Sequence, residues 1–245
     1  MVAAHEQGGA ARVGSAASAG RSSSAGGTSG TGGAVLPRLA RSELILGGQK
    51  SGKSRRAERL ARQWLEANPS HRAVLIATAQ PWDSEMRQRI QRHQADRAQR
   101  VPGMVTMEEP LQLAQAIWQH SAPDTLVVVD CLTLWLTNCL MPPPAAGAVH
   151  GAADADADAA ADSTSNNPFA HVQQAQAAHL LIAIERAPGP LVLVGNEIGL
   201  GVIPLGAQVR AFVDALGTLN QNVAAACQRV TLMAAGLPLT LKDAP

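Results

Sequence analysis

Short apolar runs alternate with longer amphipathic segments along most of the chain. Continuous apolar runs predict strands that are buried on both faces, and these runs lie at 43–46, 73–77, 125–130, 191–195 and 229–234. Apolar residues at helical spacing predict helices, which lie at 53–68, 83–97, 111–120, 132–139, 170–187 and 207–227. Because strands and helices alternate, the pattern favours an α/β fold with a mostly parallel central sheet.

Two segments of biased composition interrupt this alternation. Residues 1–40 are rich in Gly, Ala and Ser, so burial of apolar surface cannot offset the entropy lost on ordering. Residues 142–168 contain a proline run followed by an Ala-Asp repeat, which is typical of a long loop. We therefore expect a disordered tail at 1–40 and one domain at 41–245 that carries a mobile insertion at about 142–168.

The segment GGQKSGKS follows the first predicted strand and precedes an amphipathic helix. Glycines let backbone N–H groups surround phosphate oxygens, and the helix N-terminus adds the positive end of its dipole. In such a loop Lys53 can reach the β- and γ-phosphates of a nucleoside triphosphate, and the Ser54 hydroxyl can bind Mg²⁺. We therefore predict a P-loop NTPase-like three-layer fold whose nucleotide-binding residues include Gly47, Gly48, Gln49, Lys50, Ser51, Gly52, Lys53 and Ser54.

Asp130 ends the predicted strand that reads LVVVD. In P-loop enzymes, a carboxylate at the end of a second strand holds Mg²⁺. Buried strands can also end in Asp without any metal role, but the upstream P-loop favours the metal. The predicted magnesium ligands are therefore Ser54 and Asp130.

A histidine flanked by arginines lies in the predicted helix that contains SEMRQRIQRHQADR. At about 100° per residue, Arg89, His93 and Arg97 share one stripe beside Met86 and Ile90, so we expect His93 to face inward. A neutral imidazole can attack an α-phosphate while neighbouring guanidinium groups neutralise charge on the nucleotide. The alternative is a packed histidine between solvated arginines, and the spacing by itself favours this alternative.

Composition narrows the range of partners and compartments. A formal net charge of +1 gives no field that recruits nucleic acid, and the absence of Tyr with only two Phe leaves little surface for stacking bases. The three cysteines fit neither a Cys-x-x-Cys motif nor a disulfide framework, so we expect reduced thiols. No apolar run approaches the ~18 residues of a membrane span. We therefore expect a cytoplasmic protein with no nucleic-acid partner.

Together these segments resemble one family, the bifunctional adenosylcobinamide kinase/adenosylcobinamide-phosphate guanylyltransferases of cobalamin biosynthesis. The resemblance runs from about residue 44 to residue 242 and omits the Ala-Asp segment. It rests on ordered blocks rather than on one motif, and the blocks read LILGGQKSGKS, LIATAQPWDSEMRQRIQRHQADR, EEPLQL, VVVDCLTLWLTN, LVGNEIGLGVIP, RAFVDALGTLNQ and LMAAGLPLTLK. One departure is Lys50, which stands where the family usually has Arg.

The resemblance implies two reactions on one chain. In the first, ATP or GTP phosphorylates the aminopropanol hydroxyl of adenosylcobinamide. In the second, GTP guanylylates this product to give adenosylcobinamide-GDP. The second reaction passes through a GMP-histidine intermediate, whose histidine corresponds to His93. The resemblance also implies Mg²⁺ and a homo-oligomer such as a trimer. It implies further nucleotide contacts at Ala77, Thr78, Ala79, Asp96, Arg97, Glu108 and Asp130.

The residues that bind the acceptor substrate remain open at this stage. Asn196, Glu197, Gly199 and Gly201 follow a buried strand at the edge where parallel sheets bind ligands, which makes them candidates for substrate contact. A tight turn with a helix cap is the alternative. A later helix offers residues either for the site or for a subunit contact, namely Arg210, Asp214 and Asn220.

The main rival function is a single-activity P-loop kinase that acts on another small hydroxyl compound. In that enzyme His93 would be structural. Labelling of the protein by the α-phosphate of GTP separates the two functions, because a simple kinase forms no such adduct.

Overall fold

The computed structural model describes residues 39–81, 83–141 and 168–244. Most of the expected tail and of the expected insertion, at 1–38 and 142–167, lies outside the described residues. Ala40 is buried, and Leu39 packs against the core. The packed part of the chain therefore includes residues that we assigned to the tail.

All the predicted strands and helices are present, with ends within a few residues of those expected. The strands are β1 (Ser42–Gly47), β2 (Arg72–Ala77), β3 (Met104–Glu108), β4 (Thr125–Asp130), β5 (Leu191–Val194), β6 (Arg229–Ala234) and β7 (Leu237–Asp243). The helices are α1 (Lys53–Ala67), α2 (Ser84–Arg100), α3 (Leu113–His120), α4 (Leu132–Leu140), α5 (Pro168–Arg186) and α6 (Ala207–Ala226).

The strands form a seven-stranded sheet in the order β3-β2-β4-β5-β1-β6-β7. Neighbouring strands pair in parallel, except that β6 and β7 are antiparallel. The predicted α/β fold with a mostly parallel sheet is therefore confirmed. Since parallel strands need crossover connections, the helices lie between consecutive strands and cover the sheet.

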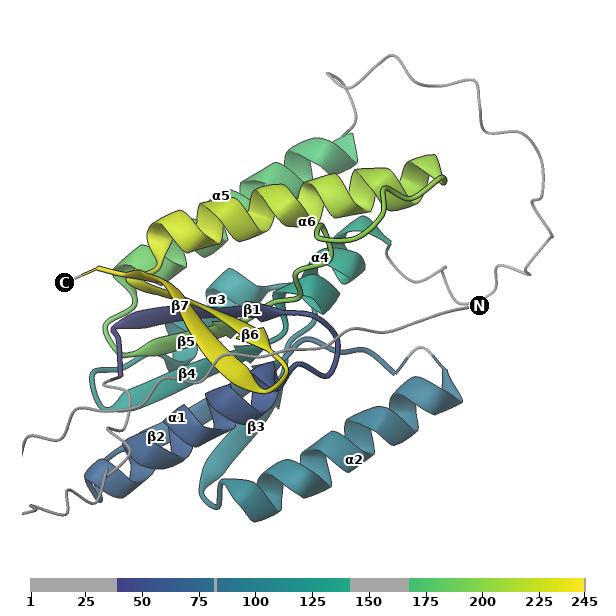
Figure 1. Cartoon of the computed structure of the whole chain (residues 1–245). Coiled ribbons are helices and arrows are strands. Elements are labelled where there is room, and N and C mark those ends of the chain that lie inside the picture. The colour runs from purple at the N-terminus through teal and green to yellow at the C-terminus, as the bar shows by residue number, and fades with distance from the viewer. Residues whose placement is uncertain (1–38, 82, 142–167, 245) are drawn as a thin grey trace, which may run out of the picture. The chain divides into compact units, whose positions relative to one another are not determined.

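Alternate residues of the central strands face two different helical layers. Leu44 and Val127 pack on one face in a cluster with residues of α3, α4, α5 and α6. Ile45 and Val128 pack on the other face in a cluster with residues of α1. Figure 1 shows α1 and α2 on one side of the sheet, with α5 and α6 on the other. These three layers agree with the predicted architecture.

Two strands, β3 and β7, were not predicted from the sequence. We predicted strands from continuous apolar runs, which mark burial on both faces. β3 reads MVTME and β7 reads LPLTLKD, and most residues of each are exposed or half-buried. Both lie at the edges of the sheet, where a strand has one neighbour and its sequence is under weaker apolar constraint.

The cysteines of the described residues are free thiols, as expected. Burial raises the pKa of Cys131 and Cys139 to about 11 and that of Cys227 to about 12. They are therefore uncharged at neutral pH and behave as small packed groups rather than as nucleophiles.

Across residues 39–81, 83–141 and 168–244, no helix combines the length and the apolar character needed to cross a membrane.

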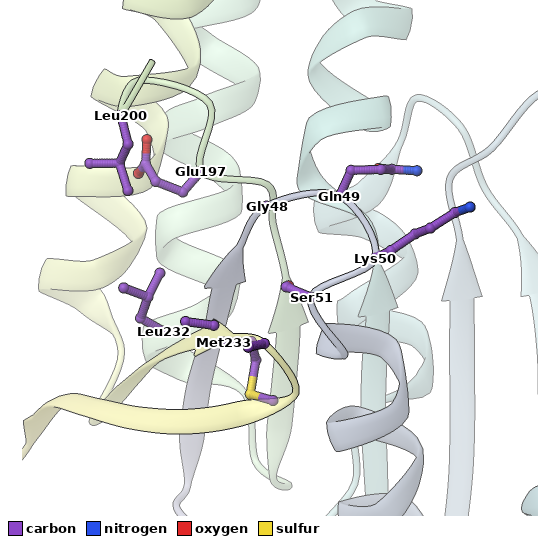
Figure 2. Close-up of a pocket in the computed structure, with 10 residues that line it drawn as sticks. Gly48, Gln49, Lys50, Ser51, Glu197, Leu200, Leu232 and Met233 are labelled. Carbon is purple, nitrogen blue, oxygen red and sulfur yellow. The ribbon is translucent and has the colours of Figure 1, made fainter.

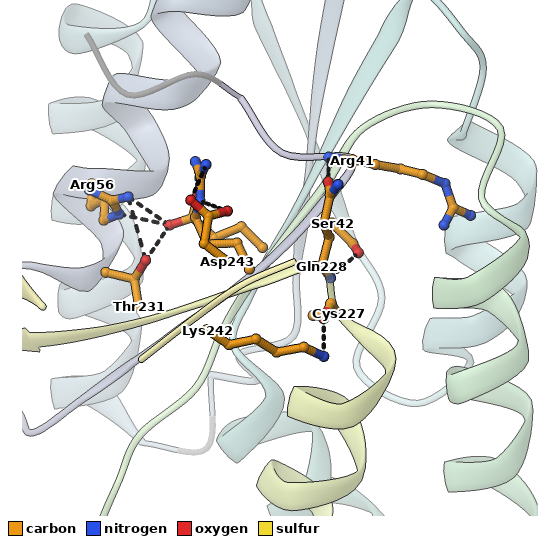
Figure 3. A network of polar contacts seen from close by, with 10 residues as sticks. Arg41, Ser42, Arg56, Cys227, Gln228, Thr231, Lys242 and Asp243 are labelled. Carbon is orange, nitrogen blue, oxygen red and sulfur yellow. Dashed lines mark hydrogen bonds and ion pairs between the residues drawn. The ribbon is translucent and has the colours of Figure 1, made fainter. Parts of the chain in front are cut away.

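A buried carboxylate ties α1 to the sheet. Glu43 of β1 is fully buried, and its Oε1 accepts from Arg56 Nε at 2.9 Å and lies 2.8 Å from Arg56 Nη2. Thr231 of β6 donates to the same oxygen at 2.8 Å. Arg229 lies 3.9 Å from Glu43 Oε2 and also pairs with Asp243 of β7. Figure 3 shows this network, which joins the helix after the P-loop to three strands.

Removing the Arg56 charge should destabilise the fold. We expect Arg56→Met to lower the free energy of unfolding by about 3–5 kcal/mol, because Glu43 would remain buried without its closest cation. Adding Glu43→Gln should recover part of this loss. Urea unfolding followed by circular dichroism measures both changes.

Arg62→Met is the matched control, because Arg62 pairs with Glu66 on the exposed side of the same helix. Exposed pairs contribute little to stability, so this variant should unfold like the wild type. Equal losses in Arg56→Met and Arg62→Met would contradict a special role for the buried pair.

Candidate functional site

Residues predicted for the site fall at the carboxyl ends of adjacent strands. Ala77 of β2 pairs in register with Glu108 of β3 on one side and with Asp130 of β4 on the other. Asp130 pairs in turn with Val194 of β5, which pairs with Ile45 of β1 just before the P-loop. Parallel sheets bind ligands outside these ends. The pairing therefore gathers distant sequence segments where a ligand is expected.

The backbone of the loop between β1 and α1 adopts conformations that favour glycine at particular positions. Gly47 and Gly52 have φ values of 151° and 101°. A Cβ at Gly47 would lie 2.5 Å from Met233 O and 2.7 Å from Ser51 Oγ, closer than atoms pack. Lys50 also has a positive φ of 56°, a costly conformation that is found where the surroundings enforce it, often at ligand sites. The predicted P-loop is therefore a tightly determined turn.

Lys53 folds back over the loop. Its side chain is buried, and its Nζ donates to Gly48 O at 2.6 Å. Burial lowers the pKa of Lys53, while Cys131 and Asp130 oppose this shift. The P-loop lysine therefore rests against the backbone of its own loop.

Two segments support the P-loop from outside it. Glu197 N, after β5, donates to Gly47 O at 3.1 Å, and Gly236 N, in the turn between β6 and β7, donates to Ser51 O at 3.1 Å. A cavity of about 370 Å³ lies beside the loop (Figure 2). Its lining consists of Gly48, Gln49, Lys50, Ser51, Glu197, Leu200, Leu232, Met233, Ala234 and Ala235.

Two buried side chains hold the start of the segment after β5. Thr133 Oγ1 accepts from Asn196 N at 2.8 Å, and Asn220 Nδ2 donates to Asn196 O at 3.1 Å. Thr133 was not singled out from the sequence, and Asn220 was left between a site role and a subunit contact. Their partner lies 63 and 24 residues away in the sequence. No local pattern connects groups at that separation.

Comparison with known protein families identifies the family of this chain. The family described as "Cobinamide kinase / cobinamide phosphate guanyltransferase" matches residues 43–241, a span that runs from β1 into β7 and includes the P-loop and Asp130. The chain belongs to this family.

Related proteins match the chain over nearly their whole length. The "Bifunctional adenosylcobalamin biosynthesis protein CobP" of Pseudomonas aeruginosa is 41% identical over 203 residues, which cover 83% of this chain and 98% of that protein. The "Bifunctional adenosylcobalamin biosynthesis protein CobU" of Escherichia coli and that of Salmonella typhimurium are 32% and 33% identical, each over 81% of this chain and 98% of its own length. The resemblance seen in the sequence blocks is confirmed.

Among solved structures, the flagellar accessory protein FlaH from Methanocaldococcus jannaschii aligns with 10% identity and a TM-score of 0.42, over 84% of this chain and 80% of that chain. A likeness this weak has no bearing on function.

The family resemblance assigns a nucleophile to His93, which lies on α2 with an exposed side chain. The expectation that His93 faces inward is therefore wrong. Arg97 is the buried residue of α2, while Met86 and Ile90 are half-buried. Because α2 is covered along a narrow stripe only, residues that flank it, including Arg89 and His93, remain exposed.

The other family-implied residues on and near α2 form contacts that hold the helix. Arg97 Nη1 donates to Thr106 Oγ1 of β3 at 3.5 Å, and Glu108 Oε1 accepts from Gln94 Nε2 at 3.1 Å. Asp96 forms an ion pair of 2.9 Å with the last residue of the same helix. Nucleotide contacts by Asp96, Arg97 and Glu108 stay predictions.

The three family-implied residues after β2 differ in exposure. Ala77 and Ala79 are half-buried at the carboxyl edge, so each has surface that a ligand could contact. Thr78 is fully buried and has no side-chain surface to offer a nucleotide. Side-chain contact with a nucleotide is therefore possible for Ala77 and Ala79 but not for Thr78.

A methyl group at Gly47 should disturb nucleotide binding. Gly47→Ala would overlap Met233 O, a backbone atom that cannot move without shifting β6. We expect about tenfold weaker ATP binding, equivalent to about 1.4 kcal/mol, measured by isothermal titration calorimetry. Gly217→Ala is the control, because its added Cβ would have no neighbour within 4 Å. Unchanged ATP affinity in Gly47→Ala would contradict the tight loop described above.

Proposed function

We propose that this chain phosphorylates adenosylcobinamide with ATP or GTP and then transfers GMP from GTP to adenosylcobinamide phosphate, giving adenosylcobinamide-GDP. The observation that carries the proposal is a P-loop whose Lys53 donates to Gly48 O within the loop, at the sheet edge where β4 ends in Asp130, in a chain that belongs to the cobinamide kinase family. Relatives that match over 98% of their length are named as bifunctional proteins of adenosylcobalamin biosynthesis, which supports two activities on one chain.

In the kinase step, the P-loop would hold the triphosphate. Backbone N–H groups of the loop and the N-terminus of α1 supply positive potential for the phosphate oxygens. The Lys53 ammonium, which donates to Gly48 O in this structure, would exchange that carbonyl for a β- or γ-phosphate oxygen. Its charge would then stabilise the γ-phosphoryl group as it passes to the acceptor hydroxyl.

Mg²⁺ fits the oxygen groups at this site. Ser54 is half-buried in the first turn of α1, and Asp130 is half-buried at the end of β4. The described residues contain no cluster of three or more His, Cys, Asp or Glu side chains that could hold a metal alone. Kinase Mg²⁺ is usually held by one or two protein oxygens together with phosphates and water. We assign Ser54 and Asp130 as its protein ligands; bound Mg²⁺ would neutralise charge on the phosphates.

In the guanylyl transfer step, a neutral imidazole nitrogen of His93 attacks the α-phosphorus of GTP. The nitrogen–phosphorus bond forms while the bridging bond to the β-phosphate breaks, and pyrophosphate leaves with the bonding electrons. A phosphate oxygen of adenosylcobinamide phosphate then attacks the same phosphorus, and the imidazole departs. The exposure of His93 supports this role, because a nucleophile must be accessible to its substrate.

The segment after β5 supports an acceptor site next to the P-loop. Glu197 and Leu200 both line the cavity there, and Leu200 is 81% exposed. An apolar side chain within a polar, glycine-rich loop suits an acceptor with both apolar and polar groups. We assign contact with adenosylcobinamide to Asn196, Glu197, Gly199 and Gly201.

We also propose that residues 41–245 act as one catalytic domain, in the cytoplasm, within a homo-oligomer such as a trimer. Free thiols on the described residues are typical of a reducing compartment. The oligomer rests on the family resemblance. Nucleic acid has no part in the proposed reactions.

His93→Ala should abolish guanylyl transfer and leave kinase activity. We expect protein incubated with Mg²⁺ and GTP labelled at the α-phosphate to retain acid-labile, base-stable label after denaturation, whereas His93→Ala retains none. His179→Ala, which removes another exposed helical histidine, should label like the wild type. Absence of label on wild-type protein that binds GTP would instead favour the single-activity kinase.

Lys53→Ala should weaken both reactions, because the same cation binds the triphosphate in each. We expect kcat/KM for phosphorylation to fall by about 10²-fold, a usual cost for removing a charge from the transition state. Arg59→Ala removes an exposed cation from the same helix and should have little effect. Steady-state assays with ATP and with GTP check both variants, and equal activities in the two would sink the assignment of Lys53.

A further inference from the structure

Thr78 is fully buried, and each of its polar groups has a protein partner. Its backbone N–H donates to Asp130 O at 3.2 Å. Its hydroxyl donates to Cys131 O at 2.7 Å and accepts from Cys131 N at 2.9 Å. Its carbonyl oxygen accepts from Asn138 Nδ2 at 2.8 Å. Thr78 therefore holds the chain at the point where it leaves β4.

These contacts surround the peptide unit that follows the Asp130 carboxylate. Thr78 binds the carbonyl oxygen on the Asp130 side of that unit and the N–H on the Cys131 side. It also binds the next carbonyl, that of Cys131. These contacts restrain the chain directly after the Asp130 Cα, and the pairing of Asp130 with β2 and β5 restrains it before that point, so together they determine the direction of the Asp130 Cα–Cβ bond. A hydroxyl that both donates and accepts is needed for this, and Ser or Thr can supply it.

Asn138 of α4 extends the arrangement to a third segment. Its Nδ2 donates to Thr78 O at 2.8 Å and to Pro110 O at 3.1 Å. The side chain is 1% exposed, and its Oδ1 lacks a hydrogen-bond partner among the described residues. A buried amide oxygen without a partner is unfavourable. The amide therefore joins the segments after β2 and β3 in spite of a cost to stability.

We propose that Thr78 is a positioning residue for Asp130, and that Asn138 holds Thr78 in place. Thr78 acts by directing the Asp130 carboxylate toward the Mg²⁺ that accompanies the nucleotide at the P-loop, and it does not touch the nucleotide. This inference rests on the proposed function, through the assignment of Asp130 as a magnesium ligand. It gives the buried Thr78 side chain a role other than the nucleotide contact that the family resemblance implies at this residue.

Thr78→Val tests the proposal, because valine keeps the shape of the side chain and removes the hydroxyl. The measurement is the affinity for a non-hydrolysable GTP analogue with and without Mg²⁺, by isothermal titration calorimetry on the full chain. We expect the gain in affinity from Mg²⁺ to fall about tenfold, the effect of a weakened ligand contact. Affinity without Mg²⁺ should stay at the wild-type value. Thr78→Ser keeps the hydroxyl and should retain most of the gain.

A double-mutant cycle distinguishes positioning from a general packing role. If Thr78 acts through Asp130, then Thr78→Val should change the Mg²⁺-dependent gain by less than about twofold in an Asp130→Asn background. Additive losses would overturn the proposal, and so would a wild-type Mg²⁺ response in Thr78→Val. Asn138→Ala provides a second route if Thr78→Val does not fold, and it should lower the same gain while sparing Mg²⁺-free binding.

The result can be separated from the fate of the proposed function. Suppose that Thr78→Val loses the Mg²⁺ response, and that the wild-type chain binds nucleotide but does not modify adenosylcobinamide. The first result would sustain the positioning role, and the second would defeat the proposed substrate. A wild-type protein whose nucleotide affinity does not respond to Mg²⁺ would overturn the positioning role itself.

Discussion

Parallel pairing brings the carboxyl ends of β1, β2, β4 and β5 to one edge of the sheet, and the candidate site depends on that register. Ala77 aligns with Asp130, and Asp130 aligns with Val194. A slip of one residue in β4 would turn Asp130 to the opposite face and bring Val129 out of its apolar cluster. The apolar clusters on the two faces therefore fix the position of the polar edge.

That edge contains polar atoms that ordinary packing would avoid. Ser51 Oγ, Asn138 Oδ1 and Asn220 Oδ1 are buried there without a hydrogen-bond partner among the described residues, whereas a fourth such atom, Glu43 Oε2, lies at the start of β1 within 3.9 Å of Arg229. Each such atom costs about 1–3 kcal/mol. Proteins tend to break local rules of this kind at functional sites and to compensate elsewhere. The concentration of these atoms near the P-loop and the strand ends is consistent with a region shaped for ligands rather than for stability.

The sequence predicts those parts of the fold that local patterns determine. The central strands have continuous apolar runs, and the P-loop glycines are recognisable because phosphate binding requires small residues at fixed spacing. Glu43 illustrates the limit, since a glutamate at the start of a strand looks solvent-exposed until Arg56 and Thr231 are known to meet it. The exposure of His93 could not be predicted for the same reason, because it depends on which neighbours cover α2. The burial of Glu43 and the exposure of His93 both depend on residues that are far away in the sequence.

The contact between the turn after β6 and the P-loop also links distant parts of the sequence. Gly236 N donates to Ser51 O, and Met233 O leaves room at Gly47 for glycine alone. The hairpin of β6 and β7 is thus part of the support on which the phosphate loop rests. In a mutational scan, substitutions in this hairpin should therefore group with those of the loop, as defects in handling nucleotide, although they lie near the opposite end of the sequence.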